Sequence, residues 1–303
     1  MGSAPRFHER SAKMREMPHV TAAEVDLPSA PDGAWGVRFP GLAGPGMPLN
    51  EAPSSWPEVA VEVRMQPDPE PAVEWGPDRA RHPLRGGHQI EIRREPLAVD
   101  LVLARPTVSE CVVAPHLTSA ASTIALWTGR AAIHAGAFLH AGGAWVLLGD
   151  KGQGKSSTLG WLATSGVPIV TDDLVVCDGD DVLVGARCVD LRADSARHLN
   201  TGRDLGVIGT RERWRIDVPS CPPRTPLRGW IFLEWGAEVA VERLSPIDRL
   251  SRLAPHRAIA VPWEDPVALL DLAARPAFVW RRPKGWRTIE ASIARLLAEI
   301  VGE

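Results

Sequence analysis

The 303-residue sequence predicts an α/β protein, and three observations lead to this prediction. A glycine-rich loop at 149–156 stands between an apolar strand pattern and a helical pattern. A second strand pattern at 167–171 follows the helix, as in a βαβ unit. Before position 108, short alternating segments separated by proline indicate a smaller β-rich region. We therefore expect an α/β domain preceded by a small β-rich N-terminal domain.

The N-terminal part divides into a tail and this β-rich domain. Residues 1–20 are charged and contain no apolar stretch of signal-peptide type, so a flexible tail is expected there. Prolines crowd between Pro28 and Pro83, which excludes long helices. We assign residues 21–108 to a domain that recognises substrate or partner. Its predicted strands are 34–39, 59–64 and 89–93, the last two alternating with period two.

From 109 to 303 the pattern is that of the larger domain. A helix is expected at 116–127, and Gly142 and Gly143 mark a hairpin between two apolar runs. The acidic turn at 178–181 marks a second hairpin, and it lacks the residue order of a calcium loop. The remaining predicted elements are strands at 137–140, 144–148, 174–177, 182–184, 230–235 and 239–244, and an amphipathic helix at 288–301.

The loop at 149–156 fits the phosphate-binding pattern G-x-x-x-x-G-K-[ST], and it follows an apolar strand pattern and precedes a helical one. Its glycines allow backbone N–H groups to turn toward an anion, and the helix N-terminus adds positive potential. Lys155 would contact the outer phosphates, and Ser156 would hold Mg²⁺. The predicted nucleotide-binding residues are Gly149, Asp150, Lys151, Gly152, Gln153, Gly154, Lys155, Ser156 and Ser157.

Two adjacent carboxylates, Asp172 and Asp173, are expected beside this loop. A helix from Lys155 to Ser165 travels about 16 Å, and a parallel strand over 167–171 returns about 16 Å. The carboxylates would therefore reach the carboxyl edge of the sheet, where ligands of α/β proteins bind. One of them could hold Mg²⁺ beside Ser156 while the other aligns an attacking hydroxyl.

Composition narrows the class of protein further. The formal net charge of −3 and a pI near 6.3 argue against sequence-independent binding to nucleic acid or an anionic membrane. The four cysteines show neither a zinc-site spacing nor pairing, so free buried thiols in the reducing cytoplasm are expected. No apolar run is long enough to span a bilayer. The sequence thus predicts a cytoplasmic protein that binds neither nucleic acid nor a membrane.

Residues 134–173 resemble the HPr kinase/phosphorylase family and its HPr-kinase-like relatives, which include peptide kinases of lasso-peptide and other natural-product clusters. The resemblance covers roughly residues 130–245 and implies the HPr kinase/PEP carboxykinase-like fold. It places the family's active-site histidine at His134, the P-loop residues at Lys155 and Ser156, and the proton acceptor at Asp173. It also implies ATP as the nucleotide and, because HPr kinases are hexameric, a homo-oligomer.

Departures from the family pattern narrow this expectation. Ser157 stands where HPr kinases have glutamate, and the later Glu- and Gly-rich segment for phosphorolysis has no counterpart. We therefore expect a kinase without phosphorylase activity that phosphorylates a serine of a peptide or small protein. ATP and Mg²⁺ are the expected cofactors, with Ser156 and Asp172 as metal ligands. The expected catalytic residues are Asp173, His134, Lys155, Arg192 and Arg215, with Arg213 as an alternative to Arg215 for the transition-state charge.

Two other functions stay open at this level. A kinase of a small-molecule hydroxyl would use the same residues. A nucleotide-gated ATPase or switch would share the P-loop, although its common versions are disfavoured: the sequence has no Asn-Lys-x-Asp motif for guanine and no Leu-Ser-Gly-Gly-Gln transporter signature. The His-Arg-Asp and Asp-Phe-Gly motifs of eukaryotic-type kinases are absent as well.

Overall fold

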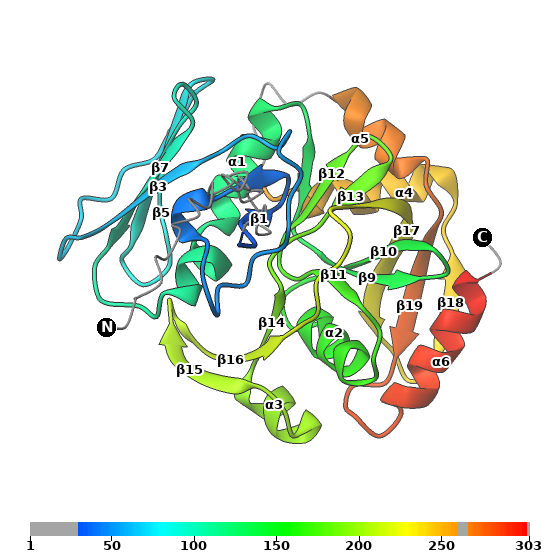
Figure 1. The fold of residues 1–303 in the computed structure, drawn as a ribbon. Coiled ribbons are helices and arrows are strands. Elements are labelled where there is room, and N and C mark those ends of the chain that lie inside the picture. The colour runs from blue at the N-terminus through cyan, green and yellow to red at the C-terminus, as the bar shows by residue number, and fades with distance from the viewer. Residues whose placement is uncertain (1–29, 260–265, 302–303) are drawn as a thin grey trace, which may run out of the picture.

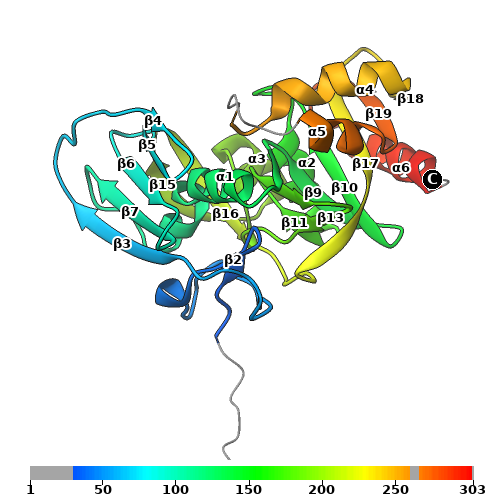
Figure 2. The ribbon, with the colours of Figure 1, turned by 90° about the horizontal axis from the view of Figure 1, so that it is seen from above.

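The computed structural model describes residues 30–259 and 266–301. The predicted tail at 1–20 lies outside the described residues. Two sheets dominate the molecule: a five-stranded sheet lies at one end, a nine-stranded sheet at the other, and helix α1 (Thr118–Trp127) lies between them (Figures 1 and 2). The fold is therefore mixed α/β, as the sequence predicts.

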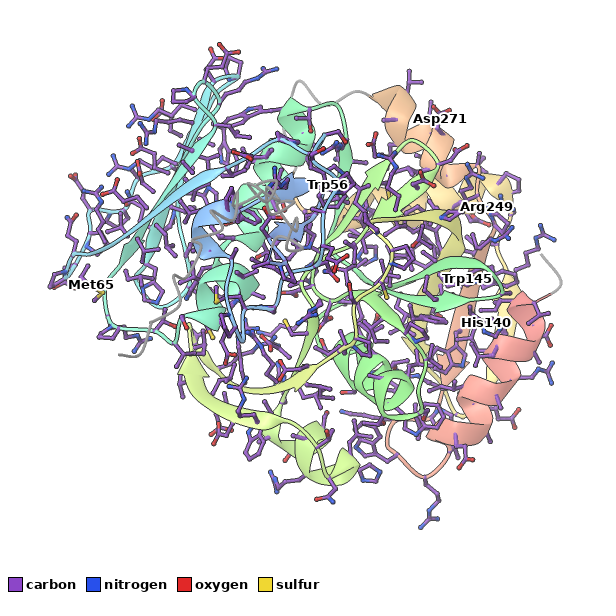
Figure 3. The ribbon with its side chains drawn as sticks, in the orientation of Figure 1. Trp56, Met65, His140, Trp145, Arg249 and Asp271 are labelled. Carbon is purple, nitrogen blue, oxygen red and sulfur yellow. The ribbon has the colours of Figure 1, made fainter. Side chains whose placement is uncertain are left out.

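The five-stranded sheet has the order β3-β7-β6-β5-β4. Its neighbours pair antiparallel except β3 and β7, which are parallel. The edge strand β3 is mostly exposed, and Met65 lies at its outer end with 52% of its surface accessible (Figure 3). The strands are β3 (Ala60–Met65), β4 (Glu74–Trp75), β5 (Arg79–Pro83), β6 (Gln89–Arg93) and β7 (Ala98–Leu103).

The single strand predicted at 34–39 is wrong, because the chain turns back within it. Strands β1 (Gly33–Ala34) and β2 (Val37–Arg38) form a tight antiparallel hairpin. Its two turn residues, Trp35 and Gly36, have φ of 53° and 81°, in the left-handed region. The backbone N–H of Trp35 donates to Val184 O at 2.6 Å, and its buried indole joins the core. Tertiary packing of this tryptophan overrides the local strand propensity.

The nine-stranded sheet carries the predicted loop. Its order is β11-β9-β10-β17-β13-β12-β8, with β19 alongside β17 and β18 alongside β19. Strands β10, β17 and β19 run parallel, whereas β9 is antiparallel to both β10 and β11. The strands are β8 (Ala131–Ile133), β9 (Gly136–His140), β10 (Gly143–Leu148), β11 (Ile169–Thr171), β12 (Val175–Asp178), β13 (Asp181–Leu183), β17 (Arg224–Trp235), β18 (Ala240–Arg243) and β19 (Ala277–Arg282).

Helices cover both faces of this sheet. Alternating residues of β10 show the two layers: Trp145 and Leu147 pack toward α2 and α6, whereas Val146 and Leu148 pack toward α4 and α5. Trp145 is seen within the sheet in Figure 3. Burial on both faces explains why β10 is a continuous apolar run. The helices are α2 (Lys155–Thr164), α4 (Pro246–Leu253), α5 (Pro266–Ala273) and α6 (Ile289–Ile300).

A three-stranded sheet connects the two larger ones. Its order is β14-β16-β15, with β14 (Cys188–Leu191), β15 (Arg203–Ile208) and β16 (Arg211–Asp217) all antiparallel, and α3 (Ala193–Leu199) follows β14. A π-helical turn, η2 (Val112–His116), precedes α1. A 3₁₀ turn, η3 (Ala254–His256), follows α4, and another, η1 (Pro40–Leu42), follows β2.

Both predicted hairpins and the closing amphipathic helix are confirmed. The division at 108–109 stays a prediction. One hydrophobic cluster contains Val99 of β7, Ala121 of α1 and Leu183 of β13, so packing is continuous across that position. In the part of the chain that the structure describes, no helix is both long and apolar enough to cross a bilayer.

Candidate active site

The loop at 149–154 joins the carboxyl end of β10 to the N-terminus of α2, as the motif requires. Gly154, with φ of 85°, occupies the left-handed region immediately before α2. The loop is closed by two bonds between its ends: Asp150 N donates to Gln153 Oε1 at 2.7 Å, and Gln153 N donates to Asp150 O at 3.1 Å. The first-turn N–H groups of α2 have no intrahelical acceptor, which makes this end suitable for an anion.

Lys155 is the first residue of α2, and its ammonium turns back over the loop. Its Nζ donates to the Gly149 carbonyl. Burial lowers the pKa of Lys155, and the charges of Asp172, Asp173 and Asp150 oppose this shift. A half-buried ammonium that donates to a loop carbonyl and lies in the field of nearby carboxylates is placed to meet a phosphate oxygen.

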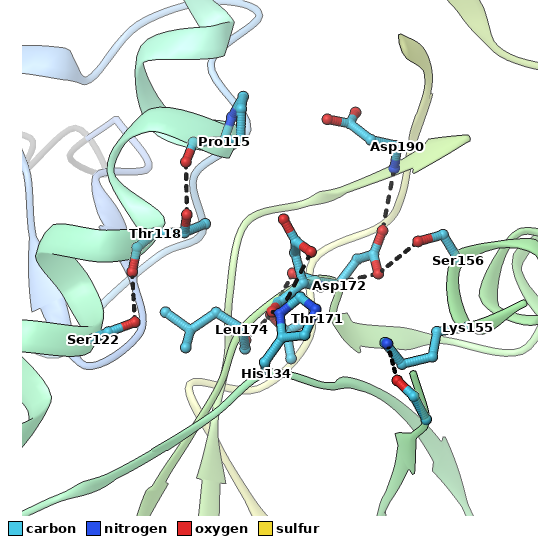
Figure 4. A network of polar contacts seen from close by, with 12 residues as sticks. Pro115, Thr118, Ser122, His134, Lys155, Ser156, Thr171, Asp172, Leu174 and Asp190 are labelled. Carbon is cyan, nitrogen blue, oxygen red and sulfur yellow. Dashed lines mark hydrogen bonds and ion pairs between the residues drawn. The ribbon is translucent and has the colours of Figure 1, made fainter. Parts of the chain in front are cut away.

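Strand β11 brings Asp172 to the start of α2, as the length argument predicts. Asp172 Oδ1 accepts from Ser156 Oγ at 3.3 Å and from Asp173 N at 2.9 Å, and Oδ2 accepts from Asp190 N at 3.3 Å (Figure 4). Gly136 lies beside it on the neighbouring strand, where an added Cβ would lie 3.5 Å from Asp172 Oδ1 and would clash with Leu159 Cδ1 at 2.4 Å.

Asp173 and His134 meet beside this carboxylate. Asp173 has φ of 71°, an uncommon conformation outside glycine that often occurs at functional sites. His134 Nδ1 lies 2.9 Å from the Asp173 carbonyl oxygen and 3.8 Å from Asp173 Oδ1. Because a carbonyl only accepts, Nδ1 carries the proton in this contact. The histidine therefore fixes the turn that presents the Asp173 side chain, and both side chains remain open to solvent.

The carboxyl group of Asp172 is buried among negative charges. Burial, together with the charges of Asp173 and Asp190, raises the pKa of Asp172 to about 7. Such crowding of negative charge is relieved by a cation. Asp172 and Ser156 offer adjacent oxygen atoms, the ligand type that Mg²⁺ prefers.

No group of three or more His, Cys, Asp or Glu side chains within 30–259 and 266–301 could hold a metal ion by itself. Mg²⁺ in nucleotide sites binds through one or two protein oxygens together with substrate phosphates and water. Ser156 and Asp172 are thus suited to such an ion.

A pocket opens on the other side of Asp172 and Asp173. Pro115 and Thr118, from the turn before α1 and its first residue, form one wall, and Asp190, Arg211 and Arg213 form the opposite one. Arg213 Nη1 donates to Asp190 Oδ2 at 2.8 Å. The pocket is thus lined both by the carboxylates of Asp172 and Asp173 and by the guanidinium groups of two arginines from β16.

Arg211 differs from the other arginines of β16. Among the residues that the structure describes, its side chain forms neither a hydrogen bond nor a salt bridge, although it is half buried and lines the pocket with Asp172 and Asp173. Burial and the charge of Arg213 lower its pKa, and the three nearby aspartates oppose this shift. An unpaired guanidinium in such a pocket is suited to bind an anionic group.

The structure does not bring the predicted Arg192 and Arg215 into this pocket. Arg192 is the exposed N-cap of α3. Arg215 is fully buried: its Nε and Nη2 donate to Asp190 at 2.8 and 2.9 Å, and its Nη1 and Nη2 reach the carbonyls of Glu110 and Ala114. Arg215 therefore holds the Asp190 carboxylate in place from within the protein core. His134, Lys155, Ser156, Asp172 and Asp173, by contrast, lie together as predicted.

Sequence reasoning missed Asp190, Arg211 and His256. Asp190 ionises readily despite its burial, because the bonds and charges of Arg215 and Arg213 lower its pKa. His256 O accepts from His134 N at 2.7 Å, and burial and the charge of Lys155 lower the pKa of its imidazole. No motif marks these positions. The alternation of arginines at 211, 213 and 215 was the available signal; the sequence-based prediction named Arg215 and, as an alternative, Arg213, of which Arg213 lines the pocket.

Comparison with known proteins adds little to this geometry. No protein-family model matches the sequence, and no curated protein matches it. Among solved structures, the Hpr(Ser) kinase/phosphatase from Coxiella burnetii is similar with a TM-score of 0.27 and 12% sequence identity, covering 55% of this chain and 94% of that chain. A TM-score this low supports no conclusion about the function of this chain.

Proposed function

We propose that this protein is an ATP- and Mg²⁺-dependent kinase that transfers the γ-phosphoryl group to a hydroxyl, and that the acceptor is a serine of a peptide or small protein of the natural-product precursor type. One observation carries the proposal: Ser156 Oγ, at the end of the phosphate-type loop, donates to Asp172 Oδ1 at 3.3 Å. This contact brings the loop next to Asp172 and Asp173. Loop, metal-type oxygens and a free carboxylate are the parts that phosphoryl transfer needs.

Each residue of the site has a role in the proposed reaction that follows from its position. Lys155 and the loop amides bind the β- and γ-phosphates, and Ser156 and Asp172 hold Mg²⁺, which neutralises charge on the phosphate oxygens. The acceptor oxygen bonds to the γ-phosphorus while the bond from that phosphorus to the β–γ bridging oxygen breaks, so ADP leaves with the electron pair. Asp173 receives the hydroxyl proton, and His134 positions Asp173.

The pocket between Asp173 and β16 is the proposed acceptor site, with Arg211 as the cation that contacts the transferred phosphoryl group. The peptide nature of the acceptor and the absence of phosphorylase activity come from the sequence resemblance. The homo-oligomer stays a prediction.

Labelled-phosphate transfer tests the proposal. Purified protein with γ-labelled ATP and Mg²⁺ is offered a library of serine peptides and, separately, small polyols. We expect label in peptides, and Asp173→Asn should reduce transfer roughly 10²- to 10⁴-fold while ATP still binds. Asp194→Asn, which alters an exposed carboxylate on α3, is the matched control and should leave transfer unchanged.

Three outcomes contradict parts of this proposal. Full activity of Asp173→Asn would overturn the assignment of the proton acceptor. Label in polyols but never in peptides would establish a small-molecule kinase instead. Release of labelled phosphate without any labelled acceptor would establish a nucleotide-gated ATPase.

A further inference from the structure

Trp235 is a solvent-facing tryptophan beside the loop, on the side opposite the carboxylates. It is the last residue of β17, which pairs in parallel with β10, the strand that leads into the loop. Asp172 and Asp173 follow β11, which lies on the other side of β10 beyond β9. A nucleotide lying along the carboxyl edge of the sheet would therefore point its γ-phosphate toward β11 and its base toward β17.

The indole of Trp235 belongs to a three-layer stack. The guanidinium of Arg282 lies 4.4 Å from the ring centroid of Trp235 and 4.7 Å from that of Trp280. Trp280 is fully buried, Arg282 is 3% exposed, and Trp235 is 36% exposed. The stack thus runs from the core to the surface and ends in an accessible aromatic ring.

Arg282 also ties this stack to the nucleotide loop. Its Nη2 donates to Thr158 Oγ1 at 2.9 Å and to Gln153 O at 3.3 Å. Burial lowers the pKa of Arg282 to about 10. Burying a guanidinium with so few anionic contacts costs free energy. The rings of Trp235 and Trp280 offset this cost through cation–π attraction. The orientation of Trp235 is therefore set by the loop and helix α2.

The approach of Trp235 to the loop is close. An added Cβ on Gly154 would lie 3.3 Å from Trp235 Cη2 and 3.6 Å from Cζ2, so the edge of the six-membered ring faces Gly154 with room for little more than one methyl group between them. One edge of the indole ring faces the loop, and Arg282 lies over one face of the ring. The exposed area of the indole therefore lies on the rest of the ring, away from this edge and this face. The distance from loop to ring is short enough for one molecule to contact both.

We propose that Trp235 is the stacking platform for the nucleobase of the triphosphate whose phosphates occupy the loop. This inference rests on the proposed nucleotide-binding function and extends it to the base. Stacking of a base on an aromatic ring favours binding roughly 5- to 100-fold and tolerates different bases. The site would therefore favour a triphosphate that carries a base over one without a base, and it would discriminate little among different bases.

Binding of ATP and of inorganic tripolyphosphate, each with Mg²⁺, separates this role from a purely structural one. In the unaltered full-length protein, ATP should bind roughly 5- to 100-fold more tightly than tripolyphosphate. Trp235→Ala should remove this advantage and leave tripolyphosphate binding unchanged, whereas Trp235→Phe should keep most of it. Trp75→Ala is the matched control, because Trp75 also stacks on a side chain, that of His82, but lies in the five-stranded sheet.

Equal affinity of the unaltered protein for ATP and tripolyphosphate would overturn the platform, whatever the variants do. An equal loss of both ligands in Trp235→Ala would overturn it too, and would show that the stack only braces the loop. If the unaltered protein binds neither ligand, the proposed nucleotide-binding function fails, and the platform fails with it.

Discussion

The two walls of the candidate site are built in different ways. The loop-side wall, from His134 to Asp173, comes from one continuous stretch of strand, loop, helix and strand, so its residues are close in sequence as well as in space. The opposite wall combines Asp190 of β14 with Arg211 and Arg213 of β16, supported by carbonyls of residues 110 and 114. The first wall is positioned by local geometry, and the second by a buried ion-pair network.

The largest expected effect tests whether the opposite wall depends on that network. Arg215→Met would leave the buried carboxylate of Asp190 with only Arg213 as a charged partner. Breaking one partner of a buried pair costs about 3–5 kcal/mol, so the free energy of unfolding should fall by about that amount in urea denaturation. Arg197→Met, which alters the exposed pair with Asp194, is the control and should change it by less than about 0.5 kcal/mol.

A stable Arg215→Met protein that has lost transfer activity would contradict this interpretation. Arg215 would then act on the substrate directly, as the sequence suggested, and the difference between the two walls would disappear.

The second prediction concerns acid sensitivity, which should arise at η2, the turn that contributes Pro115 to the pocket. Burial, with smaller effects from His88 and Arg213, lowers the pKa of His116 to about 4, and its Nε2 has no hydrogen-bond partner within the described residues. His88, whose ring centroid lies 5.0 Å from that of His116, is the other titratable group facing it. The unfolded chain binds this proton near pH 6.5, so stability is full above that pH and falls as the pH drops toward 4.

His116→Leu should therefore flatten the pH dependence of unfolding between pH 6.5 and 4 by about 2–3 kcal/mol. Urea denaturation at four or five pH values across this window measures it. His198→Leu, on the exposed surface of α3, should leave the profile as it is. An unchanged profile in His116→Leu would show that folding does not lower the pKa of His116, which contradicts the prediction.

The contrast between the walls also explains what could be predicted from sequence. Lys155 and Ser156 were found from the loop motif, and Asp172 and Asp173 because helix and strand lengths determine where a chain returns. His134 came from the resemblance alone. The alternation in β16 places Arg211, Arg213 and Arg215 on one face, but only the packing of Ala114 and Asp190 decides which of them is buried and which is free. The hairpin at Trp35 was missed for the same reason, because its turn is stabilised by a contact with Val184.

The smallest effect is the most specific test of the opposite wall. If Arg211 contacts the transferred phosphoryl group, Arg211→Ala should lower kcat/KM for phosphate transfer roughly 10- to 100-fold, in line with the loss of one charge-assisted contact. ATP binding should change little, because the loop, Lys155 and Asp172 are untouched, and stability should change little, because the Arg211 side chain forms no hydrogen bond or salt bridge within the described residues. Arg192→Ala is the matched control and should retain full activity, since Arg192 lies exposed at the start of α3. The reverse result, with Arg192 required and Arg211 dispensable, would restore the sequence-based assignment and place the acceptor outside the pocket.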